Sequence, residues 1–464
     1  MSARRALLIN PPVPSRRFAG REGRCTGEGQ VELLTLVPLS LIYPAAVLER
    51  RGWIAEVRDG VANPLGELNA ADLVLINVSP TTYEDDMALV RSMKDEAPDA
   101  HVTVTGTLPT AHPARLLADG ADSVLLGEIE GTVDELAARL EGGRSPAGIP
   151  GLVVGGSDGK IINGPRRSFL ELDALPYPAR HLIDLDKYRF VFTGERYTTV
   201  LAGRGCPHQC SFCTAPLLYG RRARYRDPAA IVEEVAHVVR ELDIPTVAFY
   251  ADTFTQDRRF VLDLCQRLVA EDLDVGWTCN ARVDTVDAEM LTAMKRAGCR
   301  YIFYGLESGS PEVLSACSKG ITPDQVREAA KLTREAGLEV VFSAMVGLPG
   351  ETRETVRQTL DLIIEVDADY CSFFVASPYE GTTFHEDVTQ SGNLAGDTMD
   401  ERHAAVRTDA LTPEDIEELA DEAFRTFILR PRVFAREAMK VVRERRLDEV
   451  RVGLGMLRDM VLGR

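Results

Sequence analysis

The chain has 464 residues, 45% of them hydrophobic, which is enough for two or three domains with buried cores of their own. Its net charge of −18 argues against nucleic acid or an anionic membrane as a partner, and is compatible with a small cationic substrate. No apolar run approaches the roughly 18 residues of a membrane span, and no signal peptide is recognisable.

Nine cysteines are present, and three of them share one short loop. The other six have no paired spacing and are expected to be small buried side chains: Cys25, Cys265, Cys279, Cys299, Cys317 and Cys371. Cysteines without a disulfide framework predict a reducing, cytoplasmic location.

The first part of the chain alternates short apolar runs with amphipathic segments. Strands are predicted at 6–9, 53–58, 72–78, 101–105 and 122–126. Helices are predicted at 39–51, 84–97, 111–118 and 131–141. This alternation predicts an α/β domain over residues 1–142, with a Rossmann-like, doubly wound parallel sheet. Ligands of such sheets bind at the carboxyl ends of the strands.

Residues 143–196 are rich in glycine and proline and are predicted to be a linker around one short strand at 151–154. Within it, Asp173–Arg180 reads as a proline-stiffened bridge. The linker separates the first sheet from a second series of strands.

The second series begins with a strand at 197–201, which leads into the loop Arg204–Cys213. This loop carries Cys206, Cys210 and Cys213 at C-x-x-x-C-x-x-C spacing. Three thiolates on one loop suit an iron–sulfur cluster, and a cube of four irons would keep one iron open for an outside ligand. The alternatives are a zinc site or three unrelated thiols. Zinc requires a fourth ligand at a second short spacing, which neither His208 nor a second C-x-x-C supplies.

Six strand–helix units follow one another over residues 197–384. The later strands are predicted at 245–250, 274–279, 300–304, 339–346 and 369–375. The helices are predicted at 228–242, 257–271, 286–297, 322–336 and 352–365. Residues 385–464 are predicted to form a small helical region, with helices at 413–429 and 431–445.

The cysteine loop and the strand ends that follow it resemble those of the radical S-adenosylmethionine (SAM) superfamily. The resemblance implies a partial (β/α)6 barrel over residues 197–384. There Cys206, Cys210 and Cys213 would hold a [4Fe–4S] cluster, with SAM on the open iron. In that superfamily the reduced cluster cleaves SAM to methionine and a 5′-deoxyadenosyl radical, which removes hydrogen from a substrate. The resemblance also implies an external electron donor of the flavodoxin or ferredoxin type, and places Phe212 near the adenine.

The same resemblance carries over further candidate SAM contacts at the strand ends. They are Asp252, Arg282, Glu307, Ser308, Ser343, Gly347 and Tyr379. Asp252 lies in a segment that holds the methionine end of SAM in relatives, and Glu307 could accept from the ribose hydroxyls or the ammonium. Arg282 is a candidate partner of the SAM carboxylate, with a surface ion pair as the alternative. The Gly347 turn resembles an adenine-contacting turn, although alone it would be an ordinary turn.

The first sheet resembles the cobalamin-binding domain that precedes the barrel in one radical SAM class. The resemblance places four residues at the corrin cleft: Ser79, Thr81, Gly106 and Gly127. The chain departs from that class at Thr105, Leu108 and Ile129, and it has no D-x-H-x-x-G motif. Added side chains block close backbone approach. Cobalamin binding and a retained scaffold with an empty or narrowed cleft therefore both stay open.

Two reactions are compatible with this resemblance. The first is cobalamin-dependent C-methylation of a small, secondary-metabolite substrate. The second is cobalamin-free dehydration, epimerisation or rearrangement of a sugar-like substrate, for example an aminoglycoside, with Tyr219 and Asp252 as candidate catalytic acid or base. A non-catalytic iron–sulfur protein is the third hypothesis, and the intact SAM-type strand ends speak against it.

Overall fold

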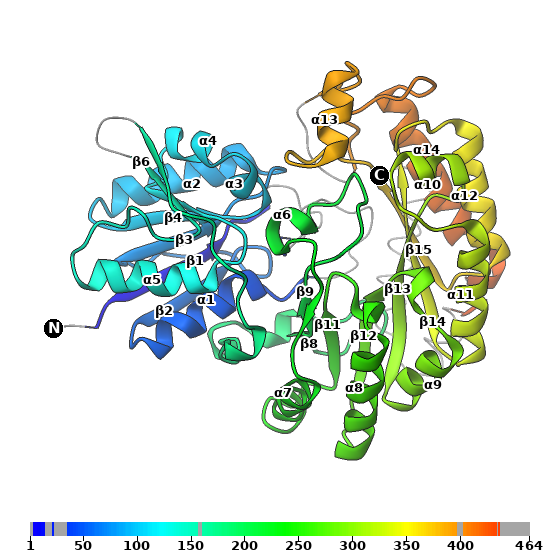
Figure 1. Cartoon of the computed structure of the whole chain (residues 1–464), viewed down its shortest axis with the longest axis horizontal. Coiled ribbons are helices and arrows are strands. Elements are labelled where there is room, and N and C mark those ends of the chain that lie inside the picture. The colour runs from blue at the N-terminus through cyan, green and yellow to red at the C-terminus, as the bar shows by residue number, and fades with distance from the viewer. Residues whose placement is uncertain are drawn as a thin grey trace.

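Figure 1 shows the computed structural model, which describes residues 3–13, 21–22, 35–155, 160–396, 402–433 and 435–436. Two α/β domains lie side by side, and the chain passes from the first to the second through the segment after residue 163. The predicted α/β class is confirmed. Cys25 and most of the helix predicted at 431–445 lie outside the described residues.

The first domain is built on a seven-stranded sheet in the order β2-β1-β3-β4-β5-β6-β7. The strands are β1 (Arg5–Asn10), β2 (Ile54–Asp59), β3 (Leu73–Asn77), β4 (His101–Thr105), β5 (Ser123–Leu125), β6 (Leu152–Gly155) and β7 (Ile161–Asn163). The first five strands are parallel. Every residue of β3 is buried, as its continuous apolar run predicts for a strand covered on both faces.

Helices cover both faces of this sheet. They are α1 (Leu39–Arg50), α2 (Tyr83–Glu96), α3 (Thr107–Ala111), α4 (Pro113–Ala118) and α5 (Glu130–Glu141). Side chains of α1 and α5 share one buried cluster, whereas α2 and α4 contribute to another. The doubly wound prediction is therefore confirmed. The helix predicted at 111–118 begins at Pro113, a residue that has no backbone N–H and favours the first turn of a helix.

The predicted boundary at residue 142 is wrong, because the first sheet continues beyond it. Strands β6 and β7 pair antiparallel with β5 and with each other. Residues 143–163 therefore belong to the first domain, and the linker is shorter than predicted. Short strands in a glycine-rich segment give a weak sequence signal, because edge strands need no long apolar run.

The second domain contains a six-stranded parallel sheet in the order β15-β14-β13-β12-β11-β8. The strands are β8 (Tyr197–Leu201), β11 (Thr246–Tyr250), β12 (Gly276–Ala281), β13 (Cys299–Glu307), β14 (Glu339–Val346) and β15 (Tyr370–Val375). Strands β8 and β15 are the two ends of this order, so the predicted partial barrel is confirmed. A small antiparallel pair, β9 (Gly203–Arg204) and β10 (Arg224–Tyr225), lies beside it.

The helices of the second domain alternate with its strands. They are α6 (Ala215–Tyr219), α7 (Pro228–Arg240), α8 (Arg258–Glu271), α9 (Ala288–Arg296), α10 (Pro311–Ala316), α11 (Pro323–Glu335), α12 (Arg353–Glu365), α13 (Thr383–Gln390) and α14 (Pro413–Ile428). The domain boundary predicted at residue 384 falls inside α13. The helix predicted at 413–429 is confirmed, and α14 packs against β15 and α12. None of the described helices is both long and apolar enough to cross a membrane.

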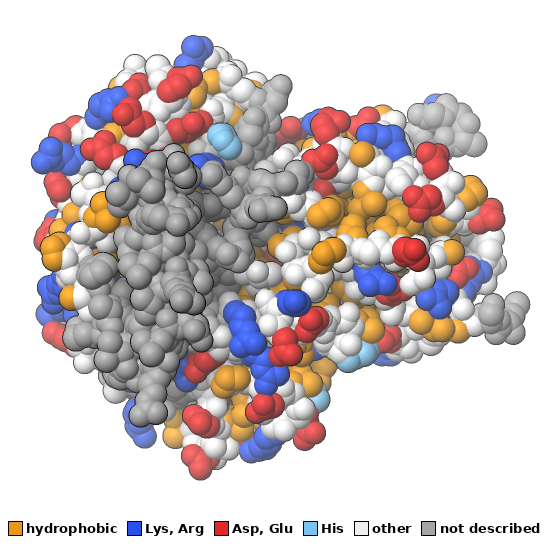
Figure 2. Space-filling model, turned by 180° about the vertical axis from the view of Figure 1, so that it is seen from behind, with side chains coloured by type: hydrophobic (Ala, Val, Ile, Leu, Met, Phe, Trp, Pro, Cys, Tyr) orange, Lys and Arg blue, Asp and Glu red, His pale blue; other side chains and the backbone are white. Residues whose placement is uncertain are grey.

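Acidic and basic side chains are interspersed over the face that Figure 2 shows.

A buried ion-pair network holds the bridge Asp173–Arg180 against the second domain. Its Arg180 is 3% exposed and pairs with Glu234 of α7, which also accepts from Arg226. The bridge is thus anchored to the second domain by a buried carboxylate between two guanidinium groups.

We expect Glu234→Ala to lower the free energy of unfolding by about 3–5 kcal/mol, because it leaves Arg180 and Arg226 buried without their shared carboxylate. The neighbouring Glu233 is exposed, so Glu233→Ala should change it by less than about 0.5 kcal/mol. Thermal melting of both variants measures the difference. Equal melting midpoints would show that Glu234 does not anchor the bridge.

Candidate functional site

The cysteine loop begins at a glycine that no other residue could replace. Gly205 has φ +87°, and a Cβ there would lie 2.2 Å from the carbonyl oxygen of Arg222. Its N–H donates to Asp252 Oδ2 at 2.7 Å. The buried Asp252 carboxylate therefore holds the start of the loop. The predicted role of Asp252 as an acid or base stays a prediction.

The loop's three cysteines form no disulfide with any described residue. Cys206 is buried, with Sγ 3.4 Å from Thr253 Oγ1, whereas Cys210 and Cys213 are half-buried. The loop is curled by a hydrogen bond from Cys213 N to Cys210 O at 3.3 Å. In the described part of the chain, no three Cys, His, Asp or Glu side chains gather as for a single metal ion. A [4Fe–4S] cube does not need three side chains around one metal ion, because each thiolate binds a different iron.

Arg282 lies against the cysteine loop and is buried. Its Nη1 is 3.9 Å from Cys210 Sγ, and its Nη2 donates to Lys319 O at 2.9 Å. Asp284 accepts from Nε at 2.9 Å and from Nη2 at 3.0 Å, so the guanidinium already has a carboxylate of this chain. Arg282 is 5% exposed, so its ion pair with Asp284 is buried and does not lie on the surface, and its role as a partner of the SAM carboxylate stays a prediction. Its positive charge suits thiolates and an anionic cluster beside it.

Glu307 is paired with Lys319, a residue that the sequence analysis missed. Lys319 Nζ donates to Glu307 Oε1 at 2.6 Å, and both residues are buried. Burial alone would lower the pKa of Lys319, but Glu307 raises it above its usual value, so Lys319 stays cationic. A Cβ at Gly305 would lie 2.5 Å from Glu307 Oε1, which explains a glycine there. Glu307 itself has φ +65°, a strained conformation typical of functional sites.

The other predicted SAM contacts are more scattered. Ser343 pairs in register with Gly305, near the Glu307–Lys319 pair. The Ser308 hydroxyl instead contacts Thr359 Oγ1 at 3.2 Å. Phe212 is half-buried against the core of the second domain, and Tyr379 is buried in the turn after β15.

The Gly347 turn faces the carboxyl-terminal helix. Gly347 has φ +102°, and a Cβ there would lie 3.1 Å from Ile416 of α14. Glu351 closes this turn by accepting from Gly347 N at 2.5 Å and from Leu348 N at 3.3 Å. The described residues thus bring together Cys206, Cys210, Arg282, Glu307 and Lys319.

Buried ion pairs join the two domains beside the cysteine loop. Arg204 Nη1 donates to Glu130 Oε2 at 3.1 Å, and Arg224 Nη1 donates to Glu128 Oε2 at 3.3 Å. Burial alone would raise the pKa of Glu130, but Arg204 lowers it below its usual value. A Cβ at Gly127 would lie 3.0 Å from Leu218 O of α6. The end of β5 and the helix after the cysteines are therefore in close contact.

A cavity of about 50 Å³, here called the interdomain cavity, lies at this junction. It is lined by Thr105, Gly106 and Gly127 from the first domain, and by Tyr219 and Tyr250 from the second. The Tyr219 ring lies 5.2 Å below the Arg204 guanidinium. Burial raises the pKa of Tyr219, so at neutral pH its hydroxyl can donate a proton but is no base.

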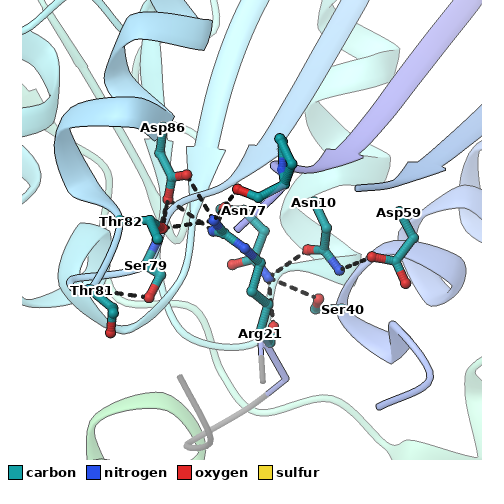
Figure 3. A network of polar contacts seen from close by, with 10 residues as sticks. Asn10, Arg21, Ser40, Asp59, Asn77, Ser79, Thr81, Thr82 and Asp86 are labelled. Carbon is teal, nitrogen blue, oxygen red and sulfur yellow. Dashed lines mark hydrogen bonds and ion pairs between the residues drawn. The ribbon is translucent and has the colours of Figure 1, made fainter. Parts of the chain in front are cut away.

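The predicted corrin residues Ser79 and Thr81 belong to a polar network at the carboxyl edge of the first sheet (Figure 3). Ser79 N donates to Asp86 Oδ2 at 2.9 Å, and Thr81 N donates to Ser79 Oγ at 3.3 Å. Asp86 is paired with Arg21 at 2.9 Å, and both side chains are buried. Arg21 was missed, because a single arginine in a long loop gives no pattern.

Cobalamin fits this edge in position and in the polar character of the lining, once the described segment Arg21–Glu22 has moved to admit it. The polar groups of Ser40, Asn77 and Thr105 line the cavity and suit an amide-rich ligand. A volume of about 50 Å³ holds one or two waters. Arg21 and Glu22 also line the cavity, so a corrin requires this segment to move away.

We expect Gly205→Ala to displace the cysteine loop, because the added Cβ meets a backbone oxygen that cannot rotate away. Iron bound per chain after anaerobic reconstitution should fall below about half of the wild-type value. Gly392→Ala is the matched control: Gly392 has φ +71°, but a Cβ there would meet nothing within 4 Å. Wild-type iron content in Gly205→Ala would refute this account of the loop.

Glu351 predicts a pH dependence of stability. Burial raises its pKa to about 8, so the folded state holds a proton that the unfolded chain has lost above its ordinary pKa. Stability should therefore fall by about 2–3 kcal/mol as the pH rises from 6 to 9. Glu351→Gln should remove this loss, whereas Glu354→Gln, at an exposed position, should keep it. Melting curves across this pH range measure the effect.

Comparison with known proteins supports both domains. Residues 200–363 match the radical SAM superfamily model, and residues 33–137 match the B12-binding domain model. An uncharacterized methyltransferase from Pyrococcus horikoshii is 31% identical over 455 residues, 94% of this chain and 95% of that protein. The cytidylyl-2-hydroxyethylphosphonate methyltransferase of Streptomyces wedmorensis is 24% identical, covering 84% of this chain and 82% of that one.

Two solved structures share the fold. The radical SAM methyltransferase TsrM from Kitasatospora setae superposes with a TM-score of 0.67 at 22% identity, covering 85% of this chain and 77% of that one. The cobalamin-dependent radical enzyme OxsB superposes with a TM-score of 0.70 at 15% identity, covering 96% of this chain and 71% of that one. The superfamily's cofactors are a [4Fe–4S] cluster and SAM, and the cysteine loop fits that cluster. The chain belongs to the radical SAM superfamily of enzymes, in the class that carries an amino-terminal B12-binding domain.

Proposed function

We propose that this enzyme transfers a methyl group to carbon in a small, secondary-metabolite substrate, with cobalamin as the methyl carrier. The observation that carries the proposal is the contact between the end of β5 and the cysteine loop through Glu130 and Arg204. It supports the proposal because it brings the carboxyl edge of the first sheet, where a corrin is expected, beside the cysteine loop. The methyltransferases among the relatives support the same reaction type.

The residues around the cysteines suit the amino-acid end of SAM. When bound, the cluster supplies one electron to cleave SAM, and cobalamin supplies a methyl group. Lys319 offers a cation for the SAM carboxylate, and Glu307 a carboxylate for its ammonium. Arg282 is fixed by Asp284 and stabilises the thiolate of Cys210.

A second candidate function is cobalamin-free radical dehydration, epimerisation or rearrangement of a sugar-like substrate. The small interdomain cavity favours it, because Arg21 and Glu22 take space that a corrin needs. In that case Tyr219, whose raised pKa keeps it protonated, could donate a proton to a substrate in the cavity. For either reaction a reducing, cytoplasmic compartment is proposed from the cysteine spacing in the sequence, which has no disulfide framework.

Methyl-deuterated SAM separates the two reactions without a known substrate. The enzyme is reconstituted with iron and sulfide, given cob(I)alamin and dithionite, and its small molecules are analysed by mass spectrometry. The proposal predicts the deuterated methyl group on the cobalamin. It also predicts 5′-deoxyadenosine only when Cys206, Cys210 and Cys213 are intact.

Two results would contradict the proposal. If 5′-deoxyadenosine forms while the label stays on methionine, the cobalamin-free reaction is the correct one. If the variant with all three cysteines replaced by alanine still forms 5′-deoxyadenosine, the cysteine loop does not hold the cluster. The three cysteines lie outside residues 33–137, which match the B12-binding domain, so replacing them does not change that domain's sequence.

A further inference from the structure

Thr253 stands at the start of the 3-10 helix Phe254–Gln256, but its hydroxyl does not cap that helix. A threonine at a helix start commonly accepts a hydrogen bond from a backbone N–H two or three residues further on. Thr322 and Thr352 do so at the starts of α11 and α12. The Thr253 hydroxyl instead lies 3.4 Å from Cys206 Sγ, and the residue is 3% exposed.

The residues around Thr253 hold its hydroxyl at this thiol. The preceding residue, Asp252, accepts from Gly205 N at 2.7 Å and so fixes the cysteine loop where Thr253 meets it. From the other side, the Tyr225 hydroxyl donates to the Thr253 carbonyl oxygen at 2.6 Å. Tyr225 is itself stacked on Phe260, with ring centroids 4.4 Å apart. Because a β-branched side chain has few rotamers, a fixed backbone also fixes the hydroxyl.

The direction of this hydrogen bond follows from the chemistry of the sulfur. A cysteine that binds iron is a thiolate and has no proton to give, so the Thr253 hydroxyl is the donor. This hydroxyl makes no other hydrogen bond with the residues that the structure describes. A hydrogen bond to a ligand sulfur stabilises negative charge, and a reduced cluster carries one negative charge more than the oxidised one. The bond therefore favours the reduced form.

We infer that the Thr253 hydroxyl raises the reduction potential of the cluster that Cys206 helps to hold. The inference rests on the cluster of the proposed function and requires neither SAM nor cobalamin. In the redox couple concerned, one electron passes from a reductant to the cluster, the reductant is oxidised by one electron, and no bond or proton moves. Thr253 acts through the sulfur of Cys206, so it is a positioning residue and not a catalytic one.

A second cysteine of the loop also faces a donor. Arg282 Nη1 lies 3.9 Å from Cys210 Sγ, so its positive charge acts on the potential in the same direction. Arg282 also binds Asp284 and the carbonyl oxygen of Lys319, and its replacement would therefore change more than one contact. Thr253 offers the cleaner test, because only its hydroxyl needs to be removed.

The test is a redox titration of the anaerobically reconstituted protein without SAM or cobalamin, with dithionite as reductant and EPR of the reduced cluster as readout. Thr253→Val keeps the shape and removes the hydroxyl. At a fixed potential its ratio of reduced to oxidised cluster should be about tenfold lower, which lowers the potential by about 59 mV for one electron. Thr253→Ser keeps the hydroxyl and should stay near the wild-type value. Thr255→Val is the matched control, because the Thr255 hydroxyl contacts Thr285 Oγ1 at 2.6 Å and no cysteine.

A second measurement detects the hydrogen bond itself. After exchange into D₂O, pulsed EPR of the reduced cluster should show one deuterium coupling in the wild type and in Thr253→Ser that Thr253→Val lacks. If Thr253→Val alone loses its iron, Thr253→Ala takes its place in both measurements with the same expectation.

Three results would overturn the inference. They are equal potentials in the wild type and in the variant without the hydroxyl, an unchanged deuterium coupling, and loss of iron from both Thr253→Val and Thr253→Ala. In the last case Thr253 would only hold the loop. A wild type that binds iron and shows these shifts, but leaves the labelled methyl group of SAM on methionine, would overturn the proposed function alone.

Discussion

The arrangement of the molecule depends on the buried contact between two carboxylates at the end of β5 and two arginines around the cysteine loop. Glu130 and Arg204 have side chains 4% and 7% exposed, so both charges have lost their water. Such burial is costly unless each charge finds close partners, and here each carboxylate receives a forked guanidinium. Separating the domains would break both ion pairs, Arg204–Glu130 and Arg224–Glu128, at the same time. The contact therefore fixes one domain against the other.

The position of Arg204 in the sequence connects this interdomain contact to the cysteine loop. Arg204 directly precedes Gly205 and Cys206, so the side chain that pairs with the first domain belongs to the cysteine loop. In both domains ligands are expected at the carboxyl ends of the parallel strands. The ion pairs turn these two edges toward each other, with Tyr219 and Tyr250 between them. A single cavity thus borders both strand edges.

Much of the fold follows from local patterns, and much of the site does not. Strands β4, β8 and β14 begin and end where they are predicted, because β-branched and aromatic residues, which favour strands, make up at least half of each. The cysteine spacing identified the cluster loop for a similar local reason. Lys319 could not be found in this way, since it lies on a loop between two helices and reaches Glu307 only through the fold. The pairing of Arg204 with Glu130 likewise joins residues 74 positions apart.

The chain departs from the B12-domain pattern at Thr105, Leu108 and Ile129, and these residues differ in whether they line the interdomain cavity. Leu108 packs into the core between α2 and the sheet, so its side chain takes no space from the cavity. Thr105 and Ile129 do line the cavity.

The larger obstacle to a corrin is the segment Arg21–Glu22. Glu22 accepts from the N–H and the hydroxyl of Ser40, so its departure leaves no buried charge behind. Arg21 cannot leave so easily, because its departure strands the buried Asp86. A corrin that enters this edge must therefore make contacts strong enough to offset the loss of one buried ion pair.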